Sequence, residues 1–317
     1  MTAFFKLIRT GNLLIIAFTQ YMVRWCIIYP IFKAYHLELQ LTELQFFFLV
    51  LSTTMIAAGG YIINDYFDVR IDKINNPARL VIDKGVKRRV AIGAHLLITI
   101  IAILIALYLS YSISYWKIAF IHLICAIGLW FYSTTFKREF LIGNIIIALF
   151  VALVPLIVGI YELLSAYHNY GLLNTKLSYK TAWTYIIGLS FFAFLTTFLR
   201  EIIKDMEDYD GDKKYGRKTM PIVLGIRNTK NVSIFIAIII IISLAYFQLH
   251  KWNRDGIIDI IYIFITIQIP LVFLVQKINS ASAKKEYRLA GNIAKIIMLS
   301  GICYLFVFAH YVLSQIK

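Results

Sequence analysis

Two segments of this chain, 140 residues apart, carry aspartates with the same spacing. In each segment the aspartates fall at positions i, i+3 and i+7, which places their carboxylates on one face of a helix. Carboxylates that face one another repel unless a cation lies between them, and Mg²⁺ prefers oxygen ligands of this kind. The spacing therefore predicts a metal site that holds a polyanionic substrate such as a diphosphate. The two motifs are Asn64-Asp65-x-x-Asp68-x-x-x-Asp72 and Lys204-Asp205-x-x-Asp208-x-x-x-Asp212.

Basic residues surround both motifs. Two carboxylate clusters can hold metal ions on either side of a diphosphate, and nearby cations would then bind the remaining phosphate oxygens. Acidic residues are concentrated in the same places, because ten of the 17 lie within 64–83 and 200–212. This density is not typical of a solvated surface and favours a binding site. The candidate cations are Lys73, Arg79, Lys137, Arg138, Arg200, Lys204, Lys213 and Lys214.

Each motif lies where a long apolar segment ends, so the elements that position it are predicted to be membrane-spanning helices. The chain has 317 residues, of which 60% are hydrophobic, and a mean hydropathy of +0.76. A soluble protein of this size cannot bury so much apolar surface. We predict an all-α bundle of nine transmembrane helices that forms a single membrane domain over 1–317. The expected spans are roughly 11–32, 43–64, 90–111, 116–135, 140–161, 181–200, 232–249, 257–276 and 290–313.

The distribution of Lys and Arg predicts how these spans are oriented. With nine spans, 23 of the 32 Lys and Arg residues fall on the side of the N-terminus and seven on the other side. Cytoplasmic loops carry the excess of Lys and Arg, so the N-terminus and both motifs are predicted to face the cytoplasm at the cell (inner) membrane. The net charge of +15 is then explained by topology and by attraction to membrane lipids. It does not indicate nucleic-acid binding, because no basic face carries interleaved exposed aromatics.

A few single residues within the spans also require an interpretation. Arg24, with Gln20 one turn before it, is costly in lipid and must face the bundle interior, in either a functional or a structural pair. Cys26, Cys125 and Cys303 lie singly within spans and show neither metal-ligand spacing nor a disulfide framework. We interpret these cysteines as packing residues.

Other classes of protein also place acids together. An EF-hand is excluded because, counted from Asp208, position 6 is Lys213 instead of Gly and position 12 is Thr219 instead of Glu. Phosphotransferases acting on CDP-alcohols require Ala-Arg three residues after Asp-Gly, whereas Asp210-Gly211 is followed by Asp-Lys-Lys-Tyr. A membrane transporter or lipid flippase remains an alternative, although transporters usually keep ionisable residues near the bilayer midplane.

Both motifs resemble the two signatures of the UbiA-type intramembrane prenyltransferases. The similarity in motifs runs from the N-terminus to about residue 226, and in hydropathy it continues to the end of the chain. The flanking residues that agree are Arg9-x-x-Asn12, Tyr132-Ser133 before Lys137-Arg138, Gly143-Asn144, and Thr219-x-Pro221 with Gly225.

The resemblance implies a nine-helix bundle with a lateral opening to lipid and two cytoplasmic Asp-rich loops. These loops would bind Mg²⁺ and a prenyl diphosphate. Carried over residue by residue, the metal ligands would be Asn64, Asp65, Asp68, Asp72, Asp205, Asp208 and Asp212, with Asp68, Asp72, Asp208 and Asp212 catalytic. The substrate-binding residues would be Asn12, Asn64, Arg79, Lys137 and Lys204.

Two segments resemble one branch of this superfamily most closely, the geranylgeranylglycerol-phosphate geranylgeranyltransferases. They are Ile74-Asn75-Asn76-Pro77-x-Arg79 and Arg200-Glu201-Ile202-Ile203-Lys204-Asp205. The branch implies transfer of a polyprenyl group to the hydroxyl of a prenylglycerol phosphate, a lipid-phase acceptor. After Arg79 the chain reads Leu-Val-Ile-Asp-Lys-Gly, where a proline-bearing segment is expected. Quinone-precursor enzymes that prenylate 4-hydroxybenzoate or a naphthoate, and the haem O and chlorophyll branches, therefore remain alternatives.

Overall fold

The computed structural model describes residues 2–75, 77, 80–251 and 257–316, and these residues form helices and connecting loops without a β-strand. Within this part of the chain, nine helical stretches are long and apolar enough to cross a membrane, as the sequence predicted. They are Thr10–Ala34, Glu43–Asn75, Arg88–Ser112, Trp116–Thr134, Ile142–Gly171, Lys176–Glu207, Gly225–Leu249, Ile257–Ser280 and Lys284–Ser314.

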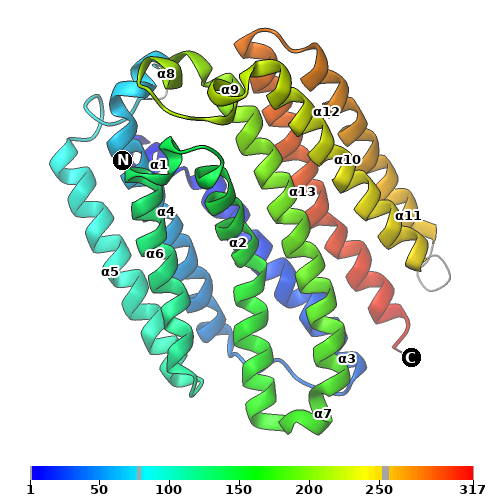
Figure 1. Cartoon of the computed structure of the whole chain (residues 1–317). Helices are drawn as coiled ribbons and strands as arrows, with labels where there is room; N and C mark the ends of the chain where they lie inside the picture. The colour runs from blue at the N-terminus through cyan, green and yellow to red at the C-terminus, as the bar shows by residue number, and fades with distance from the viewer. Residues whose placement is uncertain (1, 76, 78–79, 252–256, 317) are drawn as a thin grey trace.

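Figure 1 shows the spans side by side, with the short helices α1, α8 and α9 gathered at one end of the bundle. The α-helices are α1 (Thr2–Leu7), α2 (Thr10–Met22), α3 (Tyr29–Ala34), α4 (Glu43–Asn75), α5 (Arg88–Ser112), α6 (Ala119–Thr134), α7 (Ile142–Glu207), α8 (Tyr209–Lys214), α9 (Met220–Val223), α10 (Gly225–Lys251), α11 (Ile257–Ile263), α12 (Ile269–Ser280) and α13 (Lys284–Ser314). Helix α7 contains two spans, because the chain turns at Gly171, whose φ of 76° is non-helical.

Two spans are interrupted by a wide π-helical turn that ends two residues before a proline. These turns are Val23–Ile28, before Pro30, and Phe264–Gln268, before Pro270. Proline has no backbone N–H and its ring clashes with the carbonyl of the preceding turn, so the helix widens there instead of breaking. Both spans therefore continue across the proline.

The first aspartate motif lies on a helix, as its i, i+3 and i+7 spacing predicted, and not in the Asp-rich loop that the resemblance implied. Helix α4 continues eleven residues past the predicted end of its span and ends at Asn75. Residues 64–75 contain no glycine or proline, and Pro77 follows the last helical turn. The carboxylates of this motif are therefore held on a rigid helical face.

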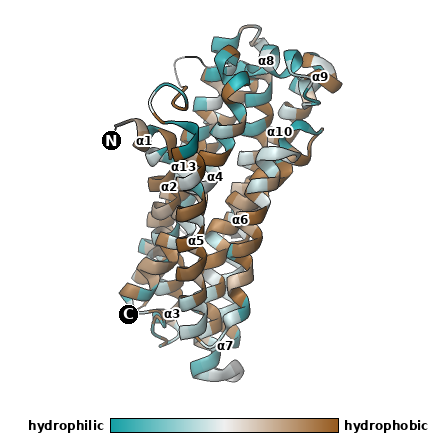
Figure 2. Ribbon diagram, turned by 90° about the vertical axis from the view of Figure 1, so that its left-hand side faces the viewer, coloured by the Kyte–Doolittle hydropathy of each residue, from teal (hydrophilic) through white to brown (hydrophobic). Residues whose placement is uncertain are grey.

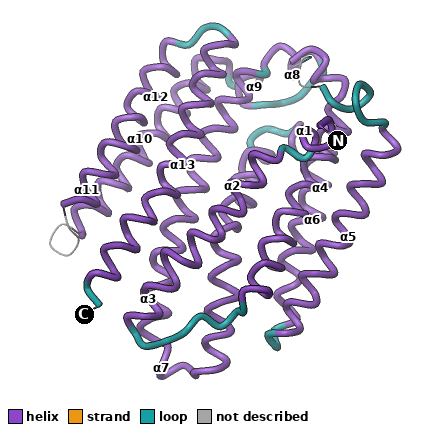
Figure 3. Tube along the Cα trace, turned by 180° about the vertical axis from the view of Figure 1, so that it is seen from behind, coloured by secondary structure: helices purple, strands orange, loops and turns teal. Residues whose placement is uncertain are grey.

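The ends of the bundle differ from its middle in polarity. Figure 2 shows apolar residues along the spans and hydrophilic residues at the ends, most densely around α8 and α9. Figure 3 shows that the connecting loops lie at the same two ends. Close helix packing in the middle depends on small residues, since a Cβ atom at Gly59 would lie 2.6 Å from Thr99 Oγ1 of α5, and one at Gly60 would lie 2.8 Å from Leu129 of α6.

Candidate active site

The first motif presents its side chains toward basic residues from two other parts of the chain. Lys137 Nζ lies 2.9 Å from Asp68 Oδ1 and donates a hydrogen bond of 3.2 Å to Asn64 Oδ1. Arg9 Nη2, just before α2, lies 2.7 Å from Asp65 Oδ1. The carboxylates of α4 are therefore paired with cations that the sequence places far away.

The second motif spans the junction between α7 and α8. Asp205 lies in the last turns of α7 and accepts a hydrogen bond of 2.9 Å from Asn144 Nδ2, at the start of the same helix. Asp208 has φ −94° and ψ 8° and separates the two helices, so Asp212 lies on α8. The change of direction at Asp208 turns the rest of the motif toward α4.

A glycine allows α8 to pack against the end of α4. The backbone N–H of Gly211 donates a hydrogen bond of 3.1 Å to Asn75 Oδ1, and a Cβ atom at Gly211 would lie 2.4 Å from that oxygen. A larger residue would displace the Asn75 side chain and disturb this hydrogen bond. This contact brings the two motifs to the same place, as their shared position at the bundle end predicted.

Arg217 connects the two motifs directly, and we did not single it out in the sequence. Its Nη1 lies 3.1 Å from Asp212 Oδ1, and its Nη2 pairs with Asp68. The preceding Gly216, with a φ of 66°, turns the chain back toward α4. The sequence signal that could have identified Arg217 was its position directly after a glycine, five residues beyond the last aspartate of the second motif.

Lys137 is positioned by a short 3₁₀ turn, Phe136–Arg138, between α6 and α7. Gly143 at the start of α7 permits the close approach, because a Cβ atom there would lie 2.8 Å from Lys137 Cα. Burial lowers the pKa of Lys137 to about 8, although the carboxylate of Asp68 acts in the opposite direction. Lys137 is thus a buried cation at the centre of the site.

Burial also changes the carboxylates of the second motif. It raises the pKa of Asp212 to about 6, against the opposing effect of the Arg217 guanidinium, and it raises the pKa of Asp208. Two polar atoms here are buried without a hydrogen-bond partner among the described residues, namely Asp208 Oδ1 and Arg217 Nε. The Asp208 oxygen could bind a cation and the Arg217 N–H could donate to an anion, so a metal-bound diphosphate would satisfy both atoms.

The donor set fits Mg²⁺, although the aspartates are not gathered around one point. All the candidate ligands are carboxylate or amide oxygens, which is the chemistry that Mg²⁺ prefers. Within the part of the chain that the structure describes, no three acidic, His or Cys residues are close enough together to hold a metal ion. Arg217 and Lys137 instead lie among the carboxylates and would have to move when a metal binds.

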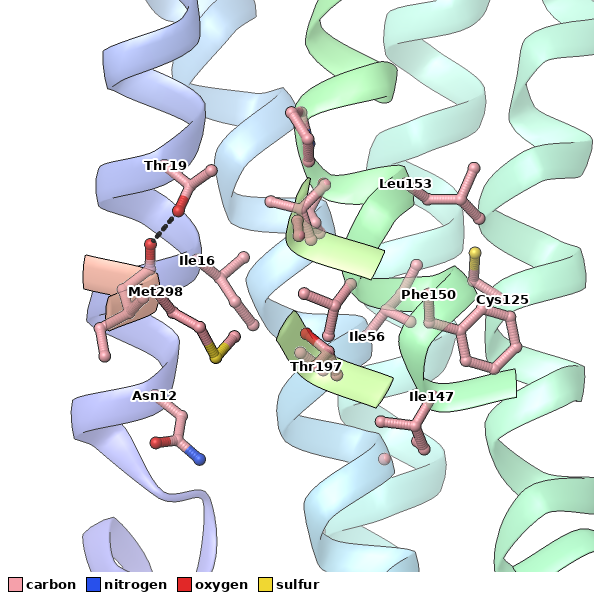
Figure 4. A pocket seen from close by; sticks show the side chains of 18 of the residues that line it. Asn12, Ile16, Thr19, Ile56, Cys125, Ile147, Phe150, Leu153, Thr197 and Met298 are labelled. Carbon is pink, nitrogen blue, oxygen red and sulfur yellow. Dashed lines mark hydrogen bonds between the residues drawn. The ribbon is translucent and has the colours of Figure 1, made fainter. Parts of the chain in front are cut away.

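An apolar cavity of about 320 Å³ opens beside the motifs. Figure 4 shows side chains from α2, α4, α6, α7 and α13 that point into it, most of them apolar. At the motif end its wall includes Asn12, Asn64 and Lys204, three of the predicted substrate-binding residues. Tyr132 also lines the cavity. The predicted residue Arg79 lies outside the described residues.

Of the remaining predicted cations, all within the described part of the chain, only one lines the cavity. Arg200 lines the cavity, whereas Lys73, Arg138, Lys213 and Lys214 are exposed. Asp72 on α4 is half-buried, one turn beyond Asp68. The site is therefore built by both motifs with Lys137 and Arg217, and the exposed lysines surround it.

Arg24 belongs to a separate polar cluster at the opposite end of the bundle. Its Nε lies 3.1 Å from Glu162 Oε1 and its Nη2 lies 3.2 Å from Glu43 Oε1, while Nη2 also donates to the carbonyl of Leu41. Glu162 is fully buried and accepts hydrogen bonds from the backbone N–H groups of Gln40 and Leu41. The structural pair is the alternative that these contacts favour for Arg24.

The family of the chain follows from comparison with known proteins. The model of the UbiA prenyltransferase family matches residues 24–309. The chain belongs to the UbiA prenyltransferase family. It is therefore an enzyme, a prenyltransferase, and a multi-pass membrane protein.

Two similar proteins are both named digeranylgeranylglyceryl phosphate synthase. The chain is 28% identical over 298 residues to the digeranylgeranylglyceryl phosphate synthase of Sulfurisphaera tokodaii, which covers 94% of this chain and 96% of the relative. It is 32% identical over 249 residues to the synthase of that name from Saccharolobus solfataricus, which covers 78% and 79%.

Solved structures of UbiA homologues share the fold. One, described for digeranylgeranylglyceryl phosphate synthase in membranes, matches with a TM-score of 0.62 at 23% identity and covers 99% of this chain and 98% of the other. A UbiA homologue from Archaeoglobus fulgidus, bound to GPP and Mg²⁺, matches with a TM-score of 0.57 at 17% identity and covers 96% and 99%. At these identities the likeness establishes the fold alone.

Proposed function

We propose that this chain transfers a polyprenyl group from a prenyl diphosphate to the hydroxyl of a prenylglycerol phosphate, in a reaction that requires Mg²⁺. The observation that carries the proposal is the bridge formed by Arg217 between Asp68 and Asp212, beside the mouth of an apolar cavity. It brings two carboxylate clusters and buried cations to a place where a charged head and an apolar tail can bind together. The name shared by two curated relatives supports the acceptor.

The donor would bind with its diphosphate between the motifs and its tail in the cavity. Lys137 and Arg217 would move from their carboxylate partners to the phosphate oxygens, because a guanidinium and an ammonium both donate strongly to phosphate. Asn64, Asp65, Asp68 and Asp72 on one side, and Asp205, Asp208 and Asp212 on the other, would hold Mg²⁺. When bound, Mg²⁺ would neutralise charge on the diphosphate and so stabilise its departure.

The reaction would break one bond and form another at the same carbon. The allylic C–O bond breaks with its electron pair remaining on the diphosphate, and the acceptor hydroxyl oxygen then bonds to that carbon and loses its proton. Tyr132 and Phe150, on the cavity wall, would face the allylic cation with their aromatic rings. The apolar lining would exclude water, which otherwise competes as a nucleophile.

We also propose that the motif end of the bundle faces the cytoplasm. The excess of Lys and Arg on that side supports this orientation. A reporter that is active only in the cytoplasm, fused after Lys317, would lie on the opposite side and should be silent. A periplasmic or external reporter at the same position should be active, and the reverse pattern would contradict the orientation.

The function is tested by offering purified protein in detergent labelled geranylgeranyl diphosphate, Mg²⁺ and a panel of acceptors. The panel contains a prenylglycerol phosphate, 4-hydroxybenzoate and a naphthoate. We expect labelled ether lipid with the glycerol phosphate alone. Product with an aromatic acid instead would retain prenyl transfer and refute the acceptor. Movement of an unchanged lipid across a bilayer, with no product from any acceptor, would support a transporter or flippase.

A further inference from the structure

A lysine lies deep in a spanning helix and on the cavity wall. Lys295 is eleven residues beyond Lys284, where α13 begins, which corresponds to about 16 Å along the helix. Its side chain is exposed and lines the cavity near Met298. A charged residue within a spanning helix is costly in lipid and usually marks the path of an ion or the place of a polar ligand.

Arg200 lies at the same depth on the facing helix. Helix α7 ends where α13 begins, and the two are joined there by a contact of 2.8 Å between Glu207 Oε1 and Arg288 Nε. Arg200 is seven residues before Glu207 and Lys295 is seven residues after Arg288, so each lies about 10 Å from this contact. Both line the cavity, which places two cations on its wall at one level.

These two cations are separate from the diphosphate site but close to it. The buried Glu201 pairs with Arg200, and the charge of Lys295 also acts on Glu201, so a bound anion would share these two cations with that carboxylate. Lys204 lies one helical turn from Arg200 on the same face of α7, toward the second motif. An anion between Arg200 and Lys295 would thus lie about 6 Å along the helix from Lys204, on the side away from the aspartates.

Two of the spans that line the cavity, α2 and α13, carry exposed residues on its wall. Three cavity-lining residues are exposed, namely Ile15 of α2 and Lys295 and Leu299 of α13. Farther along these helices Phe18 and Phe306 are in contact, with ring centroids 6.3 Å apart. A lipid that entered between α2 and α13 on the motif side of this aromatic contact would pass Lys295.

We propose that Arg200 and Lys295 form a second anion subsite, which binds the phosphate of a lipid acceptor as it enters between α2 and α13. The proposal rests on the function proposed above. In a prenylglycerol phosphate the phosphate and the free hydroxyl share one three-carbon backbone. Holding the phosphate at this level would keep the hydroxyl within one helical turn of the aspartates, where the donor carbon is released. Lys295 and Arg200 would then select a phosphorylated acceptor over a neutral one.

The test compares Lys295→Met with the wild type, using geranylgeranylglycerol phosphate and the same lipid without its phosphate. Removing one charge-assisted hydrogen bond to the acceptor phosphate should lower kcat/KM by about 10- to 100-fold. We expect that loss for the phosphorylated acceptor, less than about threefold change for the neutral one, and an unchanged KM for the donor. Lys295→Arg should restore most of the preference. Lys285→Met, an exposed lysine of α13 that does not line the cavity, is the matched control.

Each other outcome overturns a different statement. Equal losses with both acceptors would show that Lys295 supports packing, and the subsite would be refuted. An effect of Lys295→Met that appears only when anionic lipids are added to the detergent would assign the site to bulk lipid head groups, which also refutes it. Failure of the wild type to use the phosphorylated acceptor at all would instead refute the proposed function.

Discussion

Replacing Arg217 by Gln should strengthen metal binding while weakening donor binding. In the structure Arg217 pairs with both Asp68 and Asp212, so a metal that uses these carboxylates must first displace it. Its side chain is 12% exposed, so solvent screens these pairs little. A hydrogen bond to a charged group contributes about 1.5–3 kcal/mol. Removing one such competitor should tighten metal binding in the absence of substrate by about 10- to 100-fold.

The same substitution should act in the opposite direction on the donor. With prenyl diphosphate present, Arg217 would bind phosphate oxygens, and its loss should lower kcat/KM for the donor by about 10- to 100-fold. Mn²⁺ binding can be followed by electron paramagnetic resonance on purified protein, and donor kinetics by product formation. Lys218→Gln, an exposed neighbour, is the matched control. Unchanged or weaker Mn²⁺ binding in Arg217→Gln would refute the statement that Arg217 competes with the metal.

Four further substitutions test other parts of the account. Asp68→Asn and Asp208→Asn should each lower turnover by more than about 100-fold without changing the elution of the protein in size-exclusion chromatography. The exposed controls Asp83→Asn and Asp210→Asn should keep near-wild-type turnover. Normal turnover of Asp68→Asn or Asp208→Asn would refute the metal assignment. Gly211→Ala should lower the free energy of unfolding by about 1–3 kcal/mol, and with it the melting temperature and the activity, because its Cβ would overlap Asn75. Gly93→Ala, where a Cβ would have no atom within 4 Å, should have no such effect. Equal melting temperatures of Gly211→Ala and the wild type would contradict the close packing of α8 on α4. Arg24→Met should lower the free energy of unfolding by about 3–5 kcal/mol, because it leaves Glu162 buried without this partner. The protein that remains folded should keep the wild-type KM for the donor. A changed KM with unchanged stability would instead indicate a functional role for Arg24.

The sequence predicted the spans and the motifs because both depend on local patterns. Hydropathy determines which segments can cross a membrane, and the repeated spacing of Asp65, Asp68 and Asp72 indicates a shared helical face. The predicted span ended at residue 64, eleven residues before the helix ends, because hydropathy detects only where a span leaves the lipid. The helix itself continues through polar residues as far as Asn75, two residues before Pro77.

Arg217 and the partners of Arg24 were harder to foresee, because their contacts join segments far apart in the chain. Arg217 reaches Asp68 only after the chain has turned at Asp208 and again at Gly216. The fully buried partner of Arg24, Glu162, belongs to another span, Ile142–Gly171. Periodicity within one segment contains no information on such pairs.

The central claim is that both motifs act as one metal–diphosphate site at the mouth of the cavity. It is tested most directly by an experimental structure with Mg²⁺ and a non-hydrolysable thio analogue of geranylgeranyl diphosphate. The account predicts metal density between the carboxylates of Asp68 and Asp208, with Arg217 moved onto a phosphate oxygen and the prenyl tail in the cavity. Diphosphate density away from both motifs, with Arg217 still bound to Asp68 and Asp212, would contradict it.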